Sequence, residues 1–239
     1  MNCEHCGAEL RDGECPSCGA EYRPVCIHCQ AVVPPGSDRC PVCGGEVLPG
    51  WNASRETLER AGIHAFLPYM SERIYDLYLG GNPDGGGYVF HNDRGYTGPM
   101  REKLVLPGLA EGCPIYGIWN EFFCVGDECA PDRYEETFRR MFPLKTVVVS
   151  NGIREAFTYA FFGCCGLETL VLPRTIQKMY YDFYDLFTDG KSPLQNGFYK
   201  TDVTIRYRGS KEEWSRVIIT SRFQDYVDMG RIRMVFEGE

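Results

Sequence analysis

Hydrophobic residues recur at a fixed spacing between Leu144 and Phe187. The segment 144–150 (LKTVVVS) is followed 23 positions later by the segment 167–173 (LETLVLP), and apolar residues after both segments keep the same offset. Self-similarity at a period of roughly 20 to 30 residues is typical of solenoids, in which each unit buries its apolar face only by stacking on the next. We therefore expect stacked units here, none of which would fold alone.

The first part of each unit predicts a short strand. Val147–Val149 and Leu170–Leu172 are apolar, β-favouring runs that are too short for a helix and suit parallel strands. The second part carries apolar residues three or four positions apart, which predicts loose helical turns that return across the other face. Two similar buried segments in an ordinary mixed domain are the alternative.

An earlier unit begins at segment 103–108 (KLVLPG), which repeats the segment 169–174 (TLVLPR). It precedes the next unit by 43 residues, which is 20 more than one period. The excess predicts an insertion at about 110–142 with a helix that opens at Pro131. Insertions of this kind map to loops on one side of a solenoid and often form its binding surface.

The chain after the second unit predicts a cap. Val203–Tyr207 reads as a strand, and Ser210 and Glu213 have the spacing of a capping box that opens a short helix burying Trp214 and Val217. The run 232–236 (IRMVF) predicts a last strand.

Segment 144–164 (LKTVVVSNGIREAFTYAFFGC) resembles the BspA-type leucine-rich repeat of bacterial proteins, and segment 203–214 resembles the ending that follows the last repeat of such arrays. Ser150 departs from the pattern, because proline is usual there. The second unit departs at two places: it has Phe183-Tyr184 where Ala-Phe is expected, and Phe187 where Cys is expected. The resemblance covers roughly residues 104–217 and implies an α/β solenoid-like leucine-rich repeat domain with short parallel strands.

Cysteine is concentrated at the amino terminus, where eight of the 13 cysteines lie within the first 43 residues. They form four C-x2-C knuckles, a spacing that lets both sulfurs of a knuckle reach one ion. The two predicted ligand sets are Cys3, Cys6, Cys15 and Cys18, and Cys26, Cys29, Cys40 and Cys43. Gly7, Gly19 and Gly44 follow knuckles, where the tight turn needs a residue that tolerates positive φ.

This pattern resembles a double zinc ribbon over residues 1–48 and implies two structural Zn²⁺ ions, because four thiolates leave no open position for catalysis. Iron or disulfides are the alternative. His5 and His28 are surplus as ligands, so we expect them at the surface or beside the ligands. So short a segment has few large apolar residues, and we expect a chelator to unfold it while the repeat part survives.

The intervening segment 49–102 predicts a helical linker that caps the first end of the stack. Helices are expected to start at Ser54 and Ser71 and to stop at Gly80. The glycine-rich run 82–87 lacks the lysine of a phosphate-binding loop and reads as a turn. The predicted domains are therefore 1–48, 49–102 and 103–239, the last including the insertion and a carboxyl-terminal cap.

Charge argues against nucleic-acid binding. The chain has a net charge of −8, and its first 50 residues carry three arginines against seven carboxylates. Phosphate affinity comes chiefly from Lys and Arg, so an acidic ribbon would be repelled. The amino terminus lacks the pattern of a secretory signal, and no apolar run is long enough to span a membrane, so we expect a cytoplasmic protein without a membrane partner.

The function predicted from this architecture is a protein-interaction module, an intracellular adaptor or scaffold without catalysis. Its expected contact residues are aromatic: Tyr88, Tyr96, Tyr116, Trp119, Tyr180 and Tyr181. The alternative for each aromatic is a place in the core. The identity of the protein partner and the oligomeric state stay open.

Two other functions are alternatives. An enzyme would have its site in the insertion 110–142, which holds Cys113, Cys124, Cys129, Asp127 and Glu128, with a base drawn from His64 or His91. A nucleic-acid-binding zinc ribbon would need a local basic patch. Cys164 and Cys165 are expected to pack in the core as small apolar residues.

Overall fold

The computed structural model describes residues 2–29, 31–61, 65–66, 88–90, 101–118, 141–157, 161, 164, 166–180, 203–219, 223–228, 230 and 232–238. The helices predicted to start at Ser71 and Pro131 lie outside these residues. All statements of structure below concern the described part of the chain.

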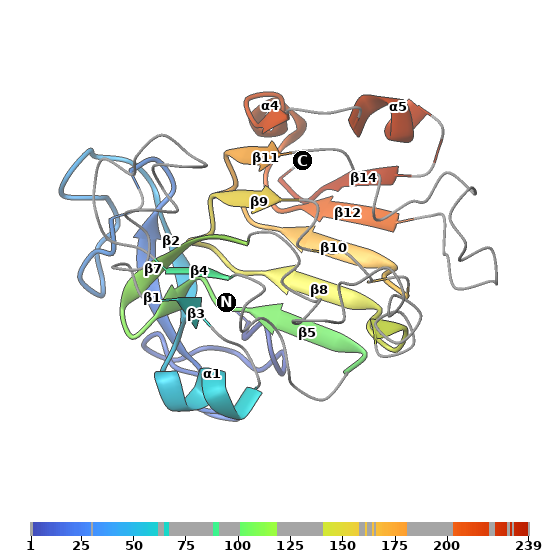
Figure 1. The fold of residues 1–239 in the computed structure, drawn as a ribbon. Coiled ribbons are helices and arrows are strands. Elements are labelled where there is room, and N and C mark those ends of the chain that lie inside the picture. Colours follow the sequence, from blue (N-terminus) through green and yellow to red (C-terminus); the bar gives the residue numbers. More distant parts are fainter. Residues whose placement is uncertain are drawn as a thin grey trace.

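A parallel sheet forms the centre of the molecule, and Figure 1 shows its strands as successive rungs from β5 to β14. Its order is β14-β12-β10-β8-β5. The strands are β5 (Lys103–Leu106), β8 (Thr146–Val149), β10 (Thr169–Leu172), β12 (Val203–Tyr207) and β14 (Ile232–Phe236). Val147 lies opposite both Leu104 and Leu170, which confirms the predicted stacking of parallel strands and the 23-residue offset.

Both faces of this sheet are apolar along the centres of β5, β8 and β10. Leu106, Val149 and Leu172 point to one face and are fully buried, while Val105, Val148 and Val171 point to the other and are nearly so. A parallel sheet covered on both faces needs continuous apolar runs instead of alternating polar and apolar residues. The Val-Val-Val and Leu-Val-Leu runs of the sequence satisfy that need.

A second sheet runs beside the first in the order β1-β2-β6-β7-β9-β11-β13, and β3 and β4 attach at β7. Its strands are β1 (Glu21–Cys26), β2 (Val47–Ala53), β3 (Ala65–Phe66), β4 (Tyr88–Phe90), β6 (Leu109–Ala110), β7 (Cys113–Ile118), β9 (Glu155–Phe157), β11 (Lys178–Tyr180) and β13 (Ile218–Ile219). Ala156 pairs with Met179, again 23 residues away.

The strands β9 and β11 differ from the sequence prediction, which placed loose helical turns after each corner. The spacing of apolar residues there fits a helix, but each short segment lies beside its copy in the next unit. Stacked copies offer every backbone N–H and C=O a ladder partner, which a single helical turn does not. The remainder of each unit lies partly outside the described residues.

The corners between the two sheets are tightly packed. An added Cβ on Gly108 would lie 1.7 Å from the main-chain oxygen of Asn151, so this close approach requires glycine. Thr175 is fully buried; its hydroxyl accepts a hydrogen bond from Gly152 N at 3.0 Å and donates to Ile153 O at 2.9 Å. The corner of one unit is thereby fixed to the corner of the next.

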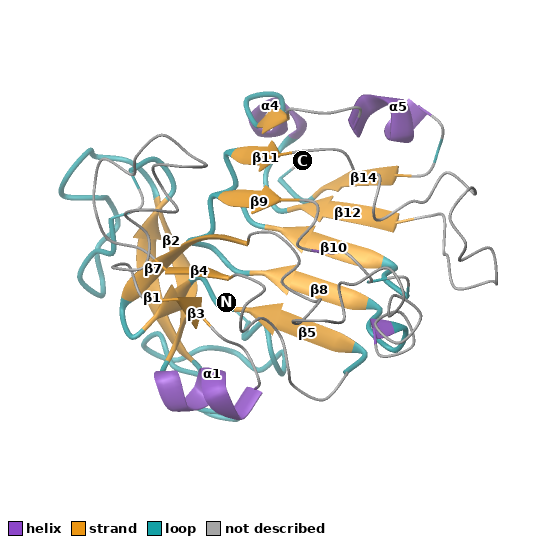
Figure 2. Ribbon diagram, in the orientation of Figure 1, coloured by secondary structure: helices purple, strands orange, loops and turns teal. Residues whose placement is uncertain are grey.

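Short helices lie at the two ends of the strand stack (Figure 2). They are α1 (Arg55–Ala61), α4 (Lys211–Trp214) and α5 (Phe223–Asp228). The predicted capping box at Ser210 and Glu213 is confirmed, and Trp214 and Val217 are buried as expected.

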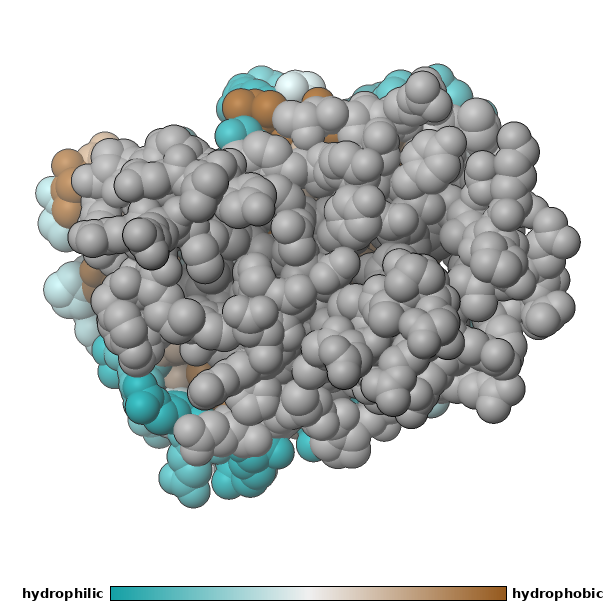
Figure 3. Space-filling model, in the orientation of Figure 1, coloured by the Kyte–Doolittle hydropathy of each residue, from teal (hydrophilic) through white to brown (hydrophobic). Residues whose placement is uncertain are grey.

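The part of the described surface that Figure 3 shows around α1 is hydrophilic. Within the described ranges, no helix is long and apolar enough to cross a membrane.

Strand β2 joins parts of the chain that the sequence assigned to separate domains. Val25 of β1 pairs with Leu48 of β2 in an antiparallel hairpin, and Asn52 at the other end of β2 pairs with Leu109 of β6 in parallel. The strand thus crosses residue 48, the predicted end of the ribbons, without interruption. The reason is apolar burial, since Trp51 is only 3% exposed.

Candidate metal centres

The structure brings together the four thiols of each predicted set. In the first, the sulfurs of Cys3 and Cys18 lie 3.6 Å apart, and those of Cys6 and Cys15 lie 3.4 Å apart. All four sulfurs lie within 4.8 Å of one another. Each close pair joins one knuckle to the other, so the set closes the loop between residues 3 and 18.

The second set has the same arrangement. The Cys26 and Cys43 sulfurs lie 3.5 Å apart, as do those of Cys29 and Cys40, and the four again lie within 4.8 Å. Cys26 and Cys40 are buried, while Cys43 is exposed. In the described part of the chain, no other group of His, Cys, Asp or Glu side chains gathers closely enough to hold a metal ion.

These distances fit a tetrahedral metal centre. Zn–S bonds of about 2.3 Å place the sulfurs of a tetrahedron about 3.8 Å apart, whereas a disulfide holds its sulfurs at about 2.05 Å. The observed pairs at 3.4–3.6 Å are close to the first value, and the eight cysteines are free thiols. Each set could therefore hold a metal ion with only small shifts of its sulfurs.

The knuckle turns point backbone donors at sulfur. His28 N and Cys29 N donate to the sulfur of Cys26 at 3.4 and 3.5 Å. Gly7, Gly19 and Gly44 have φ of 78°, 70° and 72°, as predicted for the residue that closes each turn. Such turns aim amide dipoles at the place where thiolate charge collects.

The pKa values of the thiols show how strongly the four groups interact. Burial tends to raise the pKa of Cys26, but the N–H groups of Cys29 and His28 lower it to about 6. Burial, together with the neighbouring thiols, raises the pKa of Cys29 to about 12. Four thiolates this close cannot all ionise alone, and a dication is the charge that relieves their repulsion.

The first set is fixed to the parallel sheet through Glu4, which lies inside its first knuckle. The Glu4 carboxylate accepts hydrogen bonds from the Ser150 hydroxyl and from the Arg208 guanidinium. Lys103 Nζ donates to the Glu4 main-chain oxygen at 2.7 Å, and Glu4 N donates to the Tyr22 hydroxyl at 2.8 Å. Only 11% of the Glu4 side chain is exposed, so these partners satisfy a largely buried charge.

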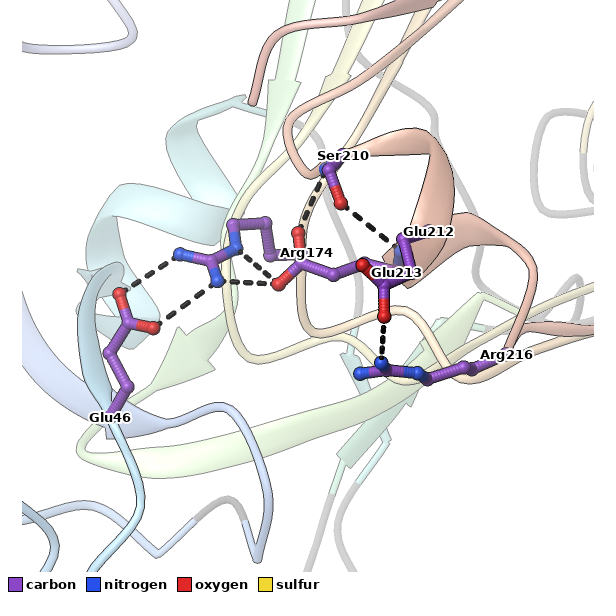
Figure 4. A network of polar contacts seen from close by, with 6 residues as sticks. All are labelled: Glu46, Arg174, Ser210, Glu212, Glu213 and Arg216. Carbon is purple, nitrogen blue, oxygen red and sulfur yellow. Dashed lines mark hydrogen bonds and ion pairs between the residues drawn. The ribbon is translucent and has the colours of Figure 1, made fainter. Parts of the chain in front are cut away.

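The second set is fixed by two arginines at the corners of the units. Arg154 Nη2 donates to Cys29 O at 2.8 Å. Arg174 forms two hydrogen bonds to the carboxylate of Glu46, at 2.9 and 3.2 Å, and also binds Glu213 at 2.5 Å (Figure 4). The hydrogen bond to Glu213 raises the pKa of Arg174. Burial acts to raise the pKa of Glu213, but the contact with Arg174 outweighs burial, and the pKa of Glu213 is lowered.

The two knuckle histidines do not belong to either set of thiols. The His5 ring packs edge-on against Trp51 with centroids 3.9 Å apart, and burial lowers its pKa. His28 is exposed. Both positions agree with the expectation that these residues are surplus as ligands.

Few of the other candidates can be placed. Tyr116 is half-buried; its hydroxyl donates to Glu155 at 3.2 Å, and the Arg154 guanidinium lies 5.6 Å from its ring centre. Cys164 is buried as predicted. The remaining candidate positions or their side chains lie outside the described residues: His64, Tyr88, His91, Tyr96, Cys113, Trp119, Cys124, Asp127, Glu128, Cys129, Cys165, Tyr180 and Tyr181.

Sequence reasoning missed the residues that join the ribbons to the sheet. Glu4 and Arg208 are 204 positions apart, and Glu46 and Arg174 are 128 apart. No local pattern distinguishes them from surface charges. The corner position of Arg174, directly after Pro173 at the end of its unit's strand, was the feature from which its role could have been suspected.

Comparison with known proteins gives no match: no family model, no curated protein and no solved structure matches this chain. The interpretation of the two centres therefore depends on their own geometry.

Proposed function

We propose that this chain is a zinc-binding protein-interaction module, an adaptor or scaffold in which two structural zinc ribbons are held against a short leucine-rich repeat ladder of the BspA type. The observation that carries the proposal is the pair of closed four-thiol sets, each tied by a buried or half-buried ion pair to the ladder. A closed set has no vacant ligand position for a substrate. Its contribution is therefore to shape a surface.

Zinc is the ion that the donors favour, because soft thiolates in a tetrahedral arrangement select it over hard cations. When bound, it offsets half of the charge of the four thiolates and links two knuckles that have little core of their own. The chain supplies the rest. Turn amides orient the sulfurs, and Tyr22 donates a hydrogen bond to the Cys3 sulfur at 3.7 Å.

The repeat ladder supports an interaction role through its shape. Successive strands in register form one continuous ladder of β5, β8, β10, β12 and β14. Solenoid-like ladders present such extended surfaces to other proteins. The first ribbon lies over part of this face and adds a wall to it, as the contacts of Glu4 show.

The test combines metal analysis with partner capture. We expect two zinc ions per purified chain, and we expect the tagged full chain to capture a saturable protein partner from a lysate of its native host. Mass spectrometry identifies the partner, and a parallel sample with a chelator shows whether the ribbons are needed. A chain that binds no metal, or that captures no partner with zinc bound, would contradict the proposal.

A further inference from the structure

The outer face of the parallel sheet carries aligned rows of side chains, because residues opposite each other in register project together. One row runs across β5, β8 and β10 and consists of Lys103, Thr146 and Thr169. The next row runs from β5 to β12 and consists of Val105, Val148, Val171 and Arg206. The face is thus polar along one row and apolar along the next, with Lys103 in the polar row on β5 and Arg206 continuing the apolar row on β12.

A cleft of about 590 Å³ lies between this face and the first zinc knuckle. Segment 3–7 of the knuckle forms one wall, and the side chains of both rows except Val105 line the other side. Its volume is within the roughly 300–1,000 Å³ of typical ligand sites. Val148 and Val171 are buried and make an apolar floor, while Thr146 and Thr169 are half-exposed and offer hydroxyls.

Two cations in the cleft are available to a ligand. Lys103 donates to a main-chain oxygen and, within the described residues, forms no ion pair. Arg206 pairs with Glu237 at 2.8 Å, but their side chains are 50% and 33% exposed, and such a surface pair contributes little. An incoming carboxylate can therefore replace Glu237. Arg208 differs, since its partner Glu4 is mostly buried.

We propose that this cleft binds an extended acidic segment of a partner protein, with two carboxylates four residues apart that meet Lys103 and Arg206. This inference rests on the proposed protein-interaction role and gives it a location. Three strand spacings separate β5 from β12, and Arg206 lies two residues farther along its strand than the partner of Lys103, so the two backbone positions are about 16 Å apart. Residues i and i+4 of an extended chain lie about 13 Å apart on the same side, and the long side chains of Lys103 and Arg206 cover the difference. The residue between them, i+2, faces the valine floor and should be apolar.

The same features disfavour nucleic acid. A nucleic-acid strand carries a phosphate at every nucleotide, and its affinity comes from neutralising many of them. This cleft offers two available cations separated by threonines, and the carboxylates of Glu4 and Glu237 lie beside them. A continuous row of phosphates would meet both carboxylates, whereas a peptide with two spaced carboxylates meets only Glu237, which it displaces from Arg206.

The test is fluorescence anisotropy of the zinc-loaded full chain with a labelled peptide, Gly-Glu-Thr-Val-Thr-Glu-Gly. Three probes with the same label serve as comparisons: the peptide with both Glu replaced by Gln, a peptide with the two Glu three residues apart, and a twelve-nucleotide oligothymidylate. We expect saturable binding of the first peptide, weakened about tenfold or more by either change, because both remove a charged contact.

Variants locate the binding. Lys103→Gln and Arg206→Gln should each weaken binding about fivefold or more, and Thr146→Val combined with Thr169→Val should weaken it about threefold. Lys211→Gln makes the same charge change on α4, away from the cleft, and should bind like the wild type. Zinc content and melting temperature verify that each variant is folded. Of these variants, Arg206→Gln disturbs folding least, because its ion pair with Glu237 lies at the surface.

Three results would each overturn the cleft assignment. They are equal binding of the glutamate and glutamine peptides, unchanged affinity in Lys103→Gln and Arg206→Gln, and tighter binding of the oligothymidylate than of the peptide. If a captured partner binds these variants as tightly as the wild type, the interaction role is retained, and its site lies elsewhere on the surface. The two proposals can therefore fail separately.

Discussion

Glu4 shows how a single residue can serve two parts of the molecule. It lies between Cys3 and Cys6 in sequence, but its carboxylate binds Ser150 and Arg208 on the sheet. A carboxylate so little exposed is stable only with strong partners, and the paired arginine is itself only 24% exposed. The ion pair therefore fixes the position of the knuckle relative to the corners of the units.

Substitution of Glu4 by Gln tests this role. The change keeps the shape but removes the charge, which leaves Arg208 half-buried without its partner. We expect the free energy of unfolding of the zinc-loaded protein to fall by about 1–3 kcal/mol. Urea denaturation measures it. Glu9→Gln, at an exposed position of the same ribbon, is the matched control; equal unfolding midpoints for both variants would rule the role out.

Residues could be predicted from the sequence where chemistry is local. The spacing of the eight cysteines identified both four-thiol sets, and the glycines after them identified the turns. Glu4, Arg154 and Arg174 could not be predicted, because an ion pair between distant segments leaves no periodic trace. Only the folded chain brings such charges together.

At the scale of elements, Arg174 connects three segments that are far apart in the sequence. It extends from the corner after β10 to Glu46 beside the second ribbon and to Glu213 in the capping box of α4 (Figure 4). Glu213 accepts from Ser210 N at 2.8 Å with its other oxygen. One carboxylate thus orders a helix start and holds the arginine.

The lowered pKa of Glu213 makes this network sensitive to acid. Because the folded pKa is below the ordinary value of 4.5, the stabilisation is fully present above pH 4.5 and is lost as the pH falls through the folded value. We expect Glu213→Gln to cost about 1 kcal/mol at neutral pH, after allowance for partial exposure, and nothing in stronger acid.

Urea unfolding of both proteins at several pH values measures this difference, and loss of zinc in acid affects both alike. Glu212→Gln is the control, since Glu212 is exposed and, within the described residues, its carboxylate pairs only with Arg216 at the surface. A difference between Glu213→Gln and wild type that stays constant below pH 4.5 would show that the network does not depend on the charge.

Elements were predictable where hydrophobic pattern and local caps agree. β8, β10, β12 and β14 and the start of α4 follow from such patterns. β9 and β11 do not, because three residues with helical spacing become strands only when a neighbouring copy pairs with them. Their structure is a property of the stack, which no single unit encodes.

At the scale of the whole molecule, the two four-thiol sets are not equivalent. Cys3, Cys15 and Tyr22 of the first ribbon pack in the same apolar core as Val105, Val148 and Val171 of the sheet. Cys26, Val33 and Cys40 of the second form a separate small cluster. The sequence predicts that a chelator unfolds residues 1–48 while the repeat part survives; the shared core leads us to expect that loss of the first metal also loosens the sheet.

Matched cysteine substitutions distinguish the two sets. Cys18 and Cys43 are both exposed ligand candidates, so Cys18→Ser and Cys43→Ser each disable one set with little loss of packing. We expect Cys18→Ser to speed hydrogen exchange about tenfold in β5, β8 and β10, because their outer valines lose their cover, and Cys43→Ser to speed it only around the second ribbon. Mass spectrometry of peptic fragments measures both. If the two variants exchange alike in the sheet, the first ribbon is not part of its core, and the ribbon wall of the cleft would be an independent, removable piece.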